Sequence, residues 1–207
     1  MNILVLAPHP DDEAIGCGGS LCLHARERAR ITAVFLTSGE LGLKHLARER
    51  VWAIREREAK GAAKILGISE LNFLRCSDWT LGDEISKAAA LLRPILKRTK
   101  PKLAYLPHPN DGHPDHQAVL PILRAAFQRS GIRALELRAY EVWTPLSQFD
   151  LVEDISSVMG RKLKALRAHK SQLREFDYVR AITGLNVYRG ILAAKCQYAE
   201  VFRNLRL

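Results

Sequence analysis

The chain has 207 residues, of which 47% are hydrophobic, a length that suits one well-buried core or at most two small ones. Its formal net charge of +10 leaves nucleic acid, a membrane surface and an anionic substrate open as partners. No apolar run is long enough to span a membrane, and the N-terminus lacks the pattern of a secretory signal, so we expect a cytoplasmic protein.

Two features of the composition narrow these options. Much of the basic charge lies in helical segments where Glu is interleaved with Arg, a pattern typical of a solvated helix face, so we do not expect nucleic-acid binding. The four cysteines have no paired spacing of the kind that binds metals. We expect them to be free thiols in a reducing compartment.

Apolar runs and helical patterns alternate along the chain. The expected strands are residues 2–7, 31–37, 71–75, 102–107 and 137–143. The expected helices are residues 13–29, 45–66, 83–98, 115–129 and 156–169, the second of which stops at Gly67. This alternation predicts a single Rossmann-like α/β domain over residues 1–207, with a mostly parallel sheet covered by helices on both faces.

The first cluster of chemically active residues, HPDDE at residues 9–13, follows the first expected strand. Ligands bind at the carboxyl ends of strands in open α/β sheets, so His9 and the carboxylates are candidates for a site. A purely structural explanation of the carboxylates is equally open, because Asp11 or Asp12 would cap the next helix and Glu13 would favour its positive end. That explanation does not account for His9.

A second cluster, HPNDGHPDH at residues 108–116, follows the expected strand 102–107. Two strand ends of the same unusual composition are difficult to explain by packing alone. In a doubly wound sheet, strands 2–7 and 102–107 would be neighbours at the point where the strand order reverses. We therefore expect the two loops to face one crevice and to form a single site.

Imidazoles and carboxylates without thiolates suit a divalent metal, with Zn²⁺ as the first choice and one ion per chain. A catalytic zinc takes three protein ligands and one water. His9 and Asp12 would bind from one loop, and one of the two histidines His113 and His116 from the other. A carboxylate outside the metal shell would take a proton from the attacking water, and the remaining histidine would donate a hydrogen bond or a proton. These groups suit the hydrolysis of an amide or ester.

The motif PHPDDEAIGCGG, together with HPDH, resembles the LmbE-like or PIG-L family of zinc-dependent N-acetylglucosaminyl de-N-acetylases. The resemblance covers most of the chain. It implies the removal of an N-acetyl group from a small amino-sugar conjugate. It also implies that the zinc ligands are His9, Asp12 and His116.

The same resemblance assigns catalytic roles. Asp11 would be the general base, and His113 would stabilise the oxyanion and protonate the leaving amine. Asp115 would orient a histidine. Pro8 stands where the family more often has alanine, a position that supplies no chemistry.

Three further residues are candidates for substrate binding. Arg55 falls within the apolar stripe of the expected helix 45–66, so its head either snorkels to solvent or reaches the crevice and binds sugar hydroxyls. The resemblance favours the second alternative. Glu40 and Asp78 follow expected strands and match sugar-contacting positions of the family, although capping of their own loops would explain them equally well.

The remaining chemically active residues are interpreted from position only. Trp143 would wall the pocket, His108 and Asp111 could support the metal ligands, and the histidines at 24, 45 and 169 would be surface or packing residues.

Two other function classes stay open, together with a homo-oligomeric assembly. A phosphoesterase-like metallohydrolase acting on an anionic substrate would suit the net charge of +10, although a two-metal enzyme would need more bridging carboxylates. A basic nucleic-acid-binding module would bind no metal and would depend strongly on salt.

Overall fold

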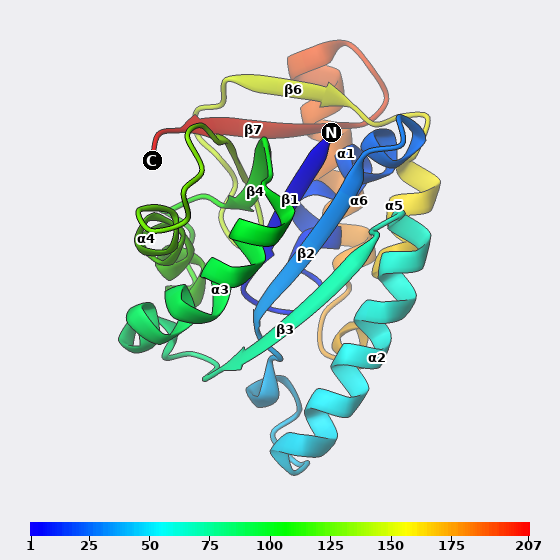
Figure 1. Cartoon of the computed structure of the whole chain (residues 1–207). Helices are drawn as coiled ribbons and strands as arrows, with labels where there is room; N and C mark the ends of the chain where they lie inside the picture. Colours follow the sequence, from blue (N-terminus) through cyan, green and yellow to red (C-terminus); the bar gives the residue numbers. More distant parts are fainter.

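The computed structural model describes residues 1–207, and one seven-stranded sheet in the order β3-β2-β1-β4-β5-β7-β6 runs through its centre (Figure 1). The five strands β1 to β5 are parallel, whereas β7 is antiparallel to both β5 and β6. The predicted α/β class with a mostly parallel sheet is confirmed. The strands are β1 (Asn2–Ala7), β2 (Arg30–Thr37), β3 (Glu70–Cys76), β4 (Leu103–Pro107), β5 (Glu136–Tyr140), β6 (Leu151–Asp154) and β7 (Ala199–Leu205).

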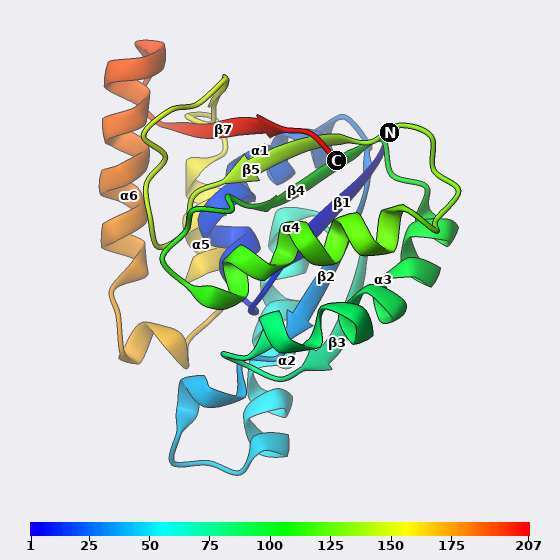
Figure 2. The same cartoon turned by 90° about the vertical axis from the view of Figure 1, so that its left-hand side faces the viewer.

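Helices cover both faces of the sheet. Figure 1 shows α3 and α4 on one side and α2 and α5 on the other, and in Figure 2 α6 stands beside β7. Two buried apolar clusters fill the spaces between these layers and the sheet. The helices are α1 (Asp12–Arg26), α2 (Arg48–Leu66), α3 (Ile85–Thr99), α4 (Pro114–Phe127), α5 (Met159–Leu166) and α6 (Tyr178–Arg189).

The pairing of β1 with β4 places the two chemically active loops side by side. Ile3, Leu4 and Val5 pair in parallel with residues 103–105, as the sequence predicted. After β1 the chain continues to β2 on one side, and after β4 it continues to β5 on the other. The strand order therefore reverses between β1 and β4, and a crevice forms beyond their carboxyl ends.

The predicted element bounds needed several corrections. Helix α1 ends at Arg26 rather than at residue 29, and β5 ends at Tyr140 rather than at residue 143. The strand stops there because the next residues turn away, and the N–H of Trp143 donates to Asp111 instead of a neighbouring strand. Helix α5 covers only Met159–Leu166 of the expected 156–169.

Three C-terminal elements, β6, α6 and β7, were not predicted at all. Strand β6 has only four residues, none of them buried, so it lacks the apolar run by which strands are recognised.

The prediction that α2 stops at Gly67 is confirmed, since this glycine ends the helix with a left-handed φ of 84°. All four cysteines are free. No helix combines the length and the apolar character needed to cross a bilayer.

Candidate metal centre and active site

A cavity of about 480 Å³ lies where the loops after β1, β3 and β4 meet. Six of the nine predicted site residues line it: His9, Asp11, Asp12, Arg55, Asp78 and His113. Asp115 and His116 are fully buried and contact residues of this lining. The structure thus brings the two sequence clusters together, as expected from the strand order.

His9, Asp12 and His116 form a compact group of possible metal ligands. One donor atom from each lies within 4.8 Å of the other two, and all three residues are buried. Asp12 Oδ2 lies 3.2 Å from His9 Nδ1 and 3.4 Å from His116 Nε2. His116 Nε2 is buried without a hydrogen-bond partner, which is costly unless another ligand satisfies it. The residues present therefore fit a bound cation.

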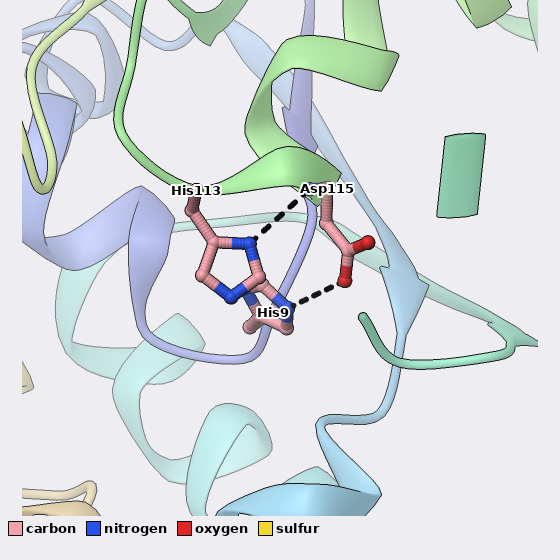
Figure 3. A group of neighbouring side chains, drawn as sticks. All are labelled: His9, His113 and Asp115. Carbon is pink, nitrogen blue, oxygen red and sulfur yellow. Dashed lines mark hydrogen bonds and ion pairs between the residues drawn. The ribbon is translucent and has the colours of Figure 1, made fainter. Parts of the chain in front are cut away.

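A second group, His9, His113 and Asp115, also brings donor atoms within 4.8 Å of one another (Figure 3). The Asp115 carboxylate and one nitrogen of His113 are already hydrogen-bonded to the backbone. The Asp115 carboxylate accepts the N–H groups of Trp79 and Leu81 at 2.8 and 3.0 Å, and it lies 3.1 Å from His9 Nε2. His113 Nδ1 accepts the backbone N–H of Asp115. The first group is thus the better metal site.

Buried carboxylates orient both histidines of the first group. His9 Nε2 faces Asp78 at 3.0 Å and Asp115 at 3.1 Å, which leaves Nδ1 to face the other two ligands. His116 Nδ1 lies 3.0 Å from Asp111 Oδ1, which leaves Nε2 to do the same. Pairs of this kind fix the tautomer and the orientation of metal-binding imidazoles. The supporting position suggested for Asp111 from the sequence agrees with this geometry.

The electrostatics of the group favour positive charge. Burial would raise the pKa of Asp12, but the neighbouring His116 and His9 hold this pKa well below its ordinary value. Burial would lower the pKa of His116, but the Asp12 and Asp111 carboxylates raise it to about 9. Carboxylates that hold protons on imidazoles in this way would equally stabilise a divalent cation in their place.

Asp11 stands apart from this group and does not cap α1. It precedes the helix with a φ of 134°, and its side chain makes no capping hydrogen bond. A non-glycine residue at such a φ is strained and persists only where its surroundings hold it. Its carboxylate lines the cavity, where burial raises the pKa to about 6 against the opposing charge of Arg55. The capping explanation therefore does not apply to Asp11.

Arg55 reaches the cavity from α2 and is 4% exposed, so its head does not snorkel to solvent. It donates to the carbonyl oxygens of Gly39 at 3.0 Å and Pro10 at 2.8 Å, and its Nη2 lies 3.3 Å from Asp11 Oδ2. Gly39 has a left-handed φ of 62°, and a Cβ there would lie 1.7 Å from Arg55 Nη1. The arginine thus ties two loops to the Asp11 carboxylate. Its predicted contact with substrate stays a prediction.

The other two predicted substrate residues differ from each other. Asp78 lines the cavity, and its Oδ2 accepts the N–H of Leu41 at 3.0 Å. Glu40 is not among the lining residues. Its carboxylate accepts hydrogen bonds from Trp52 Nε1 at 3.2 Å and from the N–H of Asp78 at 3.1 Å. These bonds agree with the alternative that Glu40 stabilises its own loop. Both contacts with substrate stay predictions.

Several cavity residues were missed by the sequence reasoning. Trp143 lines the cavity as suggested, but so does His45, which had been interpreted as a surface or packing residue. Trp79 follows a strand end, the same signal that identified the two clusters. No comparable signal marks the segment 172–178, which lines the cavity with Gln172, Glu175, Phe176 and Tyr178.

Comparison with known proteins identifies the family. Residues 4–127 match the family model PIG-L, described as GlcNAc-PI de-N-acetylase. The chain belongs to the PIG-L family. One relative of this PIG-L chain is the probable N-acetyl-alpha-D-glucosaminyl L-malate deacetylase 2 of Bacillus subtilis. It is 32% identical over 195 residues, which cover 85% of this chain and 87% of the relative.

Solved structures of similar proteins show the same PIG-L fold. The conserved protein TT1542 from Thermus thermophilus superposes with a TM-score of 0.84 at 29% identity, covering 97% of this chain and 93% of its own. The N,N'-diacetylchitobiose deacetylase from Pyrococcus horikoshii superposes with a TM-score of 0.85 at 24% identity, covering 99% of this chain and 83% of its own. This second similarity concerns the fold.

Proposed function

We propose that this PIG-L protein is a zinc-dependent hydrolase that removes the acetyl group from an N-acetylglucosamine-type amino-sugar conjugate. The observation that carries the proposal is the buried, unpartnered Nε2 of His116, which faces Asp12 Oδ2 at 3.4 Å. The whole chain, residues 1–207, would act as one deacetylase domain in the cytoplasm. Segment 172–178, far beyond the two motifs, supports this because four of its residues line the same cavity.

The proposed ligands are His9 Nδ1, Asp12 Oδ2 and His116 Nε2. Zinc is the first choice because two imidazoles and one carboxylate are typical of catalytic zinc sites. A zinc ion bound there would supply a Lewis acid that polarises the acetamide carbonyl and makes water nucleophilic near neutral pH. Asp115 and Asp78 would hold His9 in the required tautomer, and Asp111 would do the same for His116.

Asp11 is the proposed general base. Its carboxylate would take a proton from the attacking water while the water oxygen bonds to the acetamide carbon. When the C–N bond breaks, Asp11 would return this proton to the leaving amine, so that acetate and a free amino sugar result. A pKa raised by burial to about 6 suits a group that must accept and release a proton in turn. Arg55, 3.3 Å away, would hold the carboxylate in position.

His113 is the proposed oxyanion donor. Its Nδ1 accepts the N–H of Asp115 at 3.2 Å, so a neutral ring carries its proton on Nε2. Burial, followed by the charges of His9 and His116, lowers the pKa of His113, which favours this neutral form. The ring would therefore donate a hydrogen bond to the tetrahedral oxyanion rather than a proton to the amine.

Substrate hydroxyls are the proposed partners of the polar lining. Asp78 lies in the cavity beside His9 and is the best placed of the three candidates. Arg55 would offer any N–H group not already used by Gly39, Pro10 and Asp11. Glu40 would act through the N–H of Asp78, which it holds at 3.1 Å.

The test is acetate release from a panel of N-acetylglucosamine conjugates, measured with added zinc and with a chelator. We expect acetate and free amine in equal amounts, loss of activity with the chelator, and recovery when zinc is restored. Release of phosphate from phosphate esters, with no acetate from any conjugate by the zinc-loaded protein, would contradict the proposal and favour the phosphoesterase alternative.

A further inference from the structure

The mouth of the cavity carries large apolar side chains that solvent reaches. Trp79, Trp143 and Phe176 are 56%, 53% and 55% exposed, and all three line the cavity. These three residues are called the aromatic rim below. Leu41, 44% exposed, lies in the same lining. A group of exposed apolar side chains around a hollow marks a binding surface, whereas a single exposed one needs no explanation.

Trp79 is held at the rim by the metal-site framework. Its φ is 70°, a strained backbone conformation for a bulky residue. The N–H of Trp79 donates to Asp115 Oδ2 at 2.8 Å, the same oxygen that faces His9. Its indole ring lies 4.5 Å from the ring of His113, measured between centroids. The strained backbone therefore keeps an exposed indole beside the proposed oxyanion donor.

Trp143 is held in a parallel way. Its N–H donates to Asp111 Oδ2 at 3.0 Å, and the other oxygen of Asp111 faces His116. The Trp143 ring lies 6.2 Å from His113 and 6.0 Å from Phe176, the second pair at an interplanar angle of 80°. Two of the carboxylates that orient the proposed metal-binding histidines, Asp115 and Asp111, thus also hold the backbones of the two tryptophans of the aromatic rim.

We infer that the aromatic rim is a second subsite, which binds a flat, apolar-faced ring attached to the amino sugar. This inference rests on the proposed function. An acetamide that reaches His113 must have its sugar close to both tryptophans, so the group joined to that sugar lies over the rim. Aromatic side chains gain most from flat partners, which a second pyranose ring or an aromatic aglycone would supply.

The charged residues of the cavity do not favour the binding of a small, highly anionic group at the aromatic rim. Arg55 is engaged by two carbonyl oxygens and Asp11. Lys44 and His45 are the other basic residues of the outer lining, and Glu175 lies in the same lining with the opposite charge. A compact dicarboxylate such as malate would find no bidentate partner there.

The test compares kcat/KM for acetate release by the zinc-loaded protein from four glycosides of N-acetylglucosamine. Two carry a ring, N,N'-diacetylchitobiose and the phenyl glycoside, and two do not, the methyl and the malate glycosides. We expect kcat/KM for the better ring-bearing substrate to exceed kcat/KM for each of the two ring-free substrates by about tenfold, as for one well-formed aromatic contact. A higher kcat/KM for N,N'-diacetylchitobiose would indicate a second sugar at the rim, and a higher kcat/KM for the phenyl glycoside would indicate an aromatic aglycone.

Variants of the rim residues test whether the aromatic rim causes the preference for ring-bearing substrates. In Trp143→Ala and Phe176→Ala we expect KM for the ring-bearing substrates to rise. The ratio of their kcat/KM to that of the methyl glycoside should then fall towards one. Tyr188→Ala is the matched control, because Tyr188 is an aromatic residue of similar exposure, 57%, outside the cavity lining. It should keep the full preference.

Three outcomes would overturn the inference. The wild type could process the methyl glycoside as well as the ring-bearing ones, it could prefer the malate glycoside, or the rim variants could lose all substrates equally. In each of these outcomes the wild type still releases acetate, so the proposed function is spared. No acetate from any glycoside would overturn the proposed function together with the inference.

Discussion

The floor of the cavity, formed by His9, Asp12 and His116, is buried, whereas the aromatic rim above it is more than half exposed. In the floor a buried carboxylate faces each histidine, and the donor atoms lie within 4.8 Å of one another. In the rim the side chains lie largely in solvent, and hydrogen bonds hold the backbones of the two tryptophans. From this comparison we expect the floor to determine the chemistry and the rim to select the substrate.

The two regions are nevertheless connected. Asp115 and Asp111 each contact one histidine of the floor and the backbone of one rim tryptophan. A change of aglycone specificity is therefore expected from substitutions at the rim side chains, which do not disturb these carboxylates. A change in metal binding is expected from substitutions of the floor residues themselves.

The largest effect should come from removing a ligand of the floor. In His116→Ala we expect tight zinc binding to be lost and acetate release to fall to the level of the chelator-treated wild type. Strands and helices should persist in the circular dichroism spectrum, because the sheet pairs without the metal. His24→Ala, which removes a half-buried histidine bonded to the Tyr105 hydroxyl, should keep its zinc. One zinc per chain in purified His116→Ala would refute the ligand assignment.

A smaller loss is expected where Arg55 holds Asp11 beside the floor. Gly39→Ala places a Cβ 1.7 Å from Arg55 Nη1, so the guanidinium must move away from Asp11. We expect kcat to fall by up to about 10²-fold, since misplacement of a catalytic group by about 1 Å has this effect. Zinc content should stay near that of the wild type. Gly82→Ala is the control, because a Cβ there meets no atom within 4 Å. Normal turnover in Gly39→Ala would show that Arg55 does not position Asp11.

The orienting carboxylates should affect metal affinity more than stability. Asp111→Asn keeps the shape of the side chain but removes the charge that faces His116. We expect the zinc Kd to rise by about 10–100-fold, the usual cost of losing such a partner. Competition with a chromophoric chelator measures this shift, and Asp83→Asn, at an exposed aspartate, serves as the control. An unchanged Kd would mean that Asp111 serves only the two loops whose N–H groups it accepts, at His113 and at Trp143 and Thr144.

The smallest effect on stability should come from the rim itself. In Phe176→Ala we expect the free energy of unfolding in urea to change by less than about 0.5 kcal/mol, as for most surface substitutions. Zinc content should not change. A loss of about 2 kcal/mol or more, on the scale of burying or exposing a core side chain, would show that Phe176 belongs to the packed core rather than to the substrate surface.

The parts of the site that could be predicted from the sequence are those that follow strands. His9 and His116 were found because β1 and β4 are continuous apolar runs, and because neighbouring parallel strands bring their carboxyl ends together. The alternation of strands and helices likewise predicted the parallel part of the sheet. The resemblance to a family then separated His113 from His116, which the spacing alone left open.

The remainder depends on contacts between distant segments. The cavity wall at Phe176 comes from a short turn between α5 and α6, which has no periodic pattern. Strand β7 joins the sheet antiparallel to β5, and no local feature of its sequence indicates that partner. The position of Trp79 depends on a hydrogen bond to a carboxylate 36 residues away. Such contacts are set by the folded chain rather than by local propensity.

The central claim, that Asp11 is the base beside a metal held by its neighbour Asp12, is tested most directly by Asp11→Asn. Zinc content and acetate release are measured on the same purified sample. Asn keeps the size of the side chain but accepts no proton, so we expect zinc near one ion per chain and a fall in kcat of about 10²–10⁴, the usual contribution of general acid–base catalysis. Zinc-loaded Asp11→Asn protein with normal turnover would contradict the account.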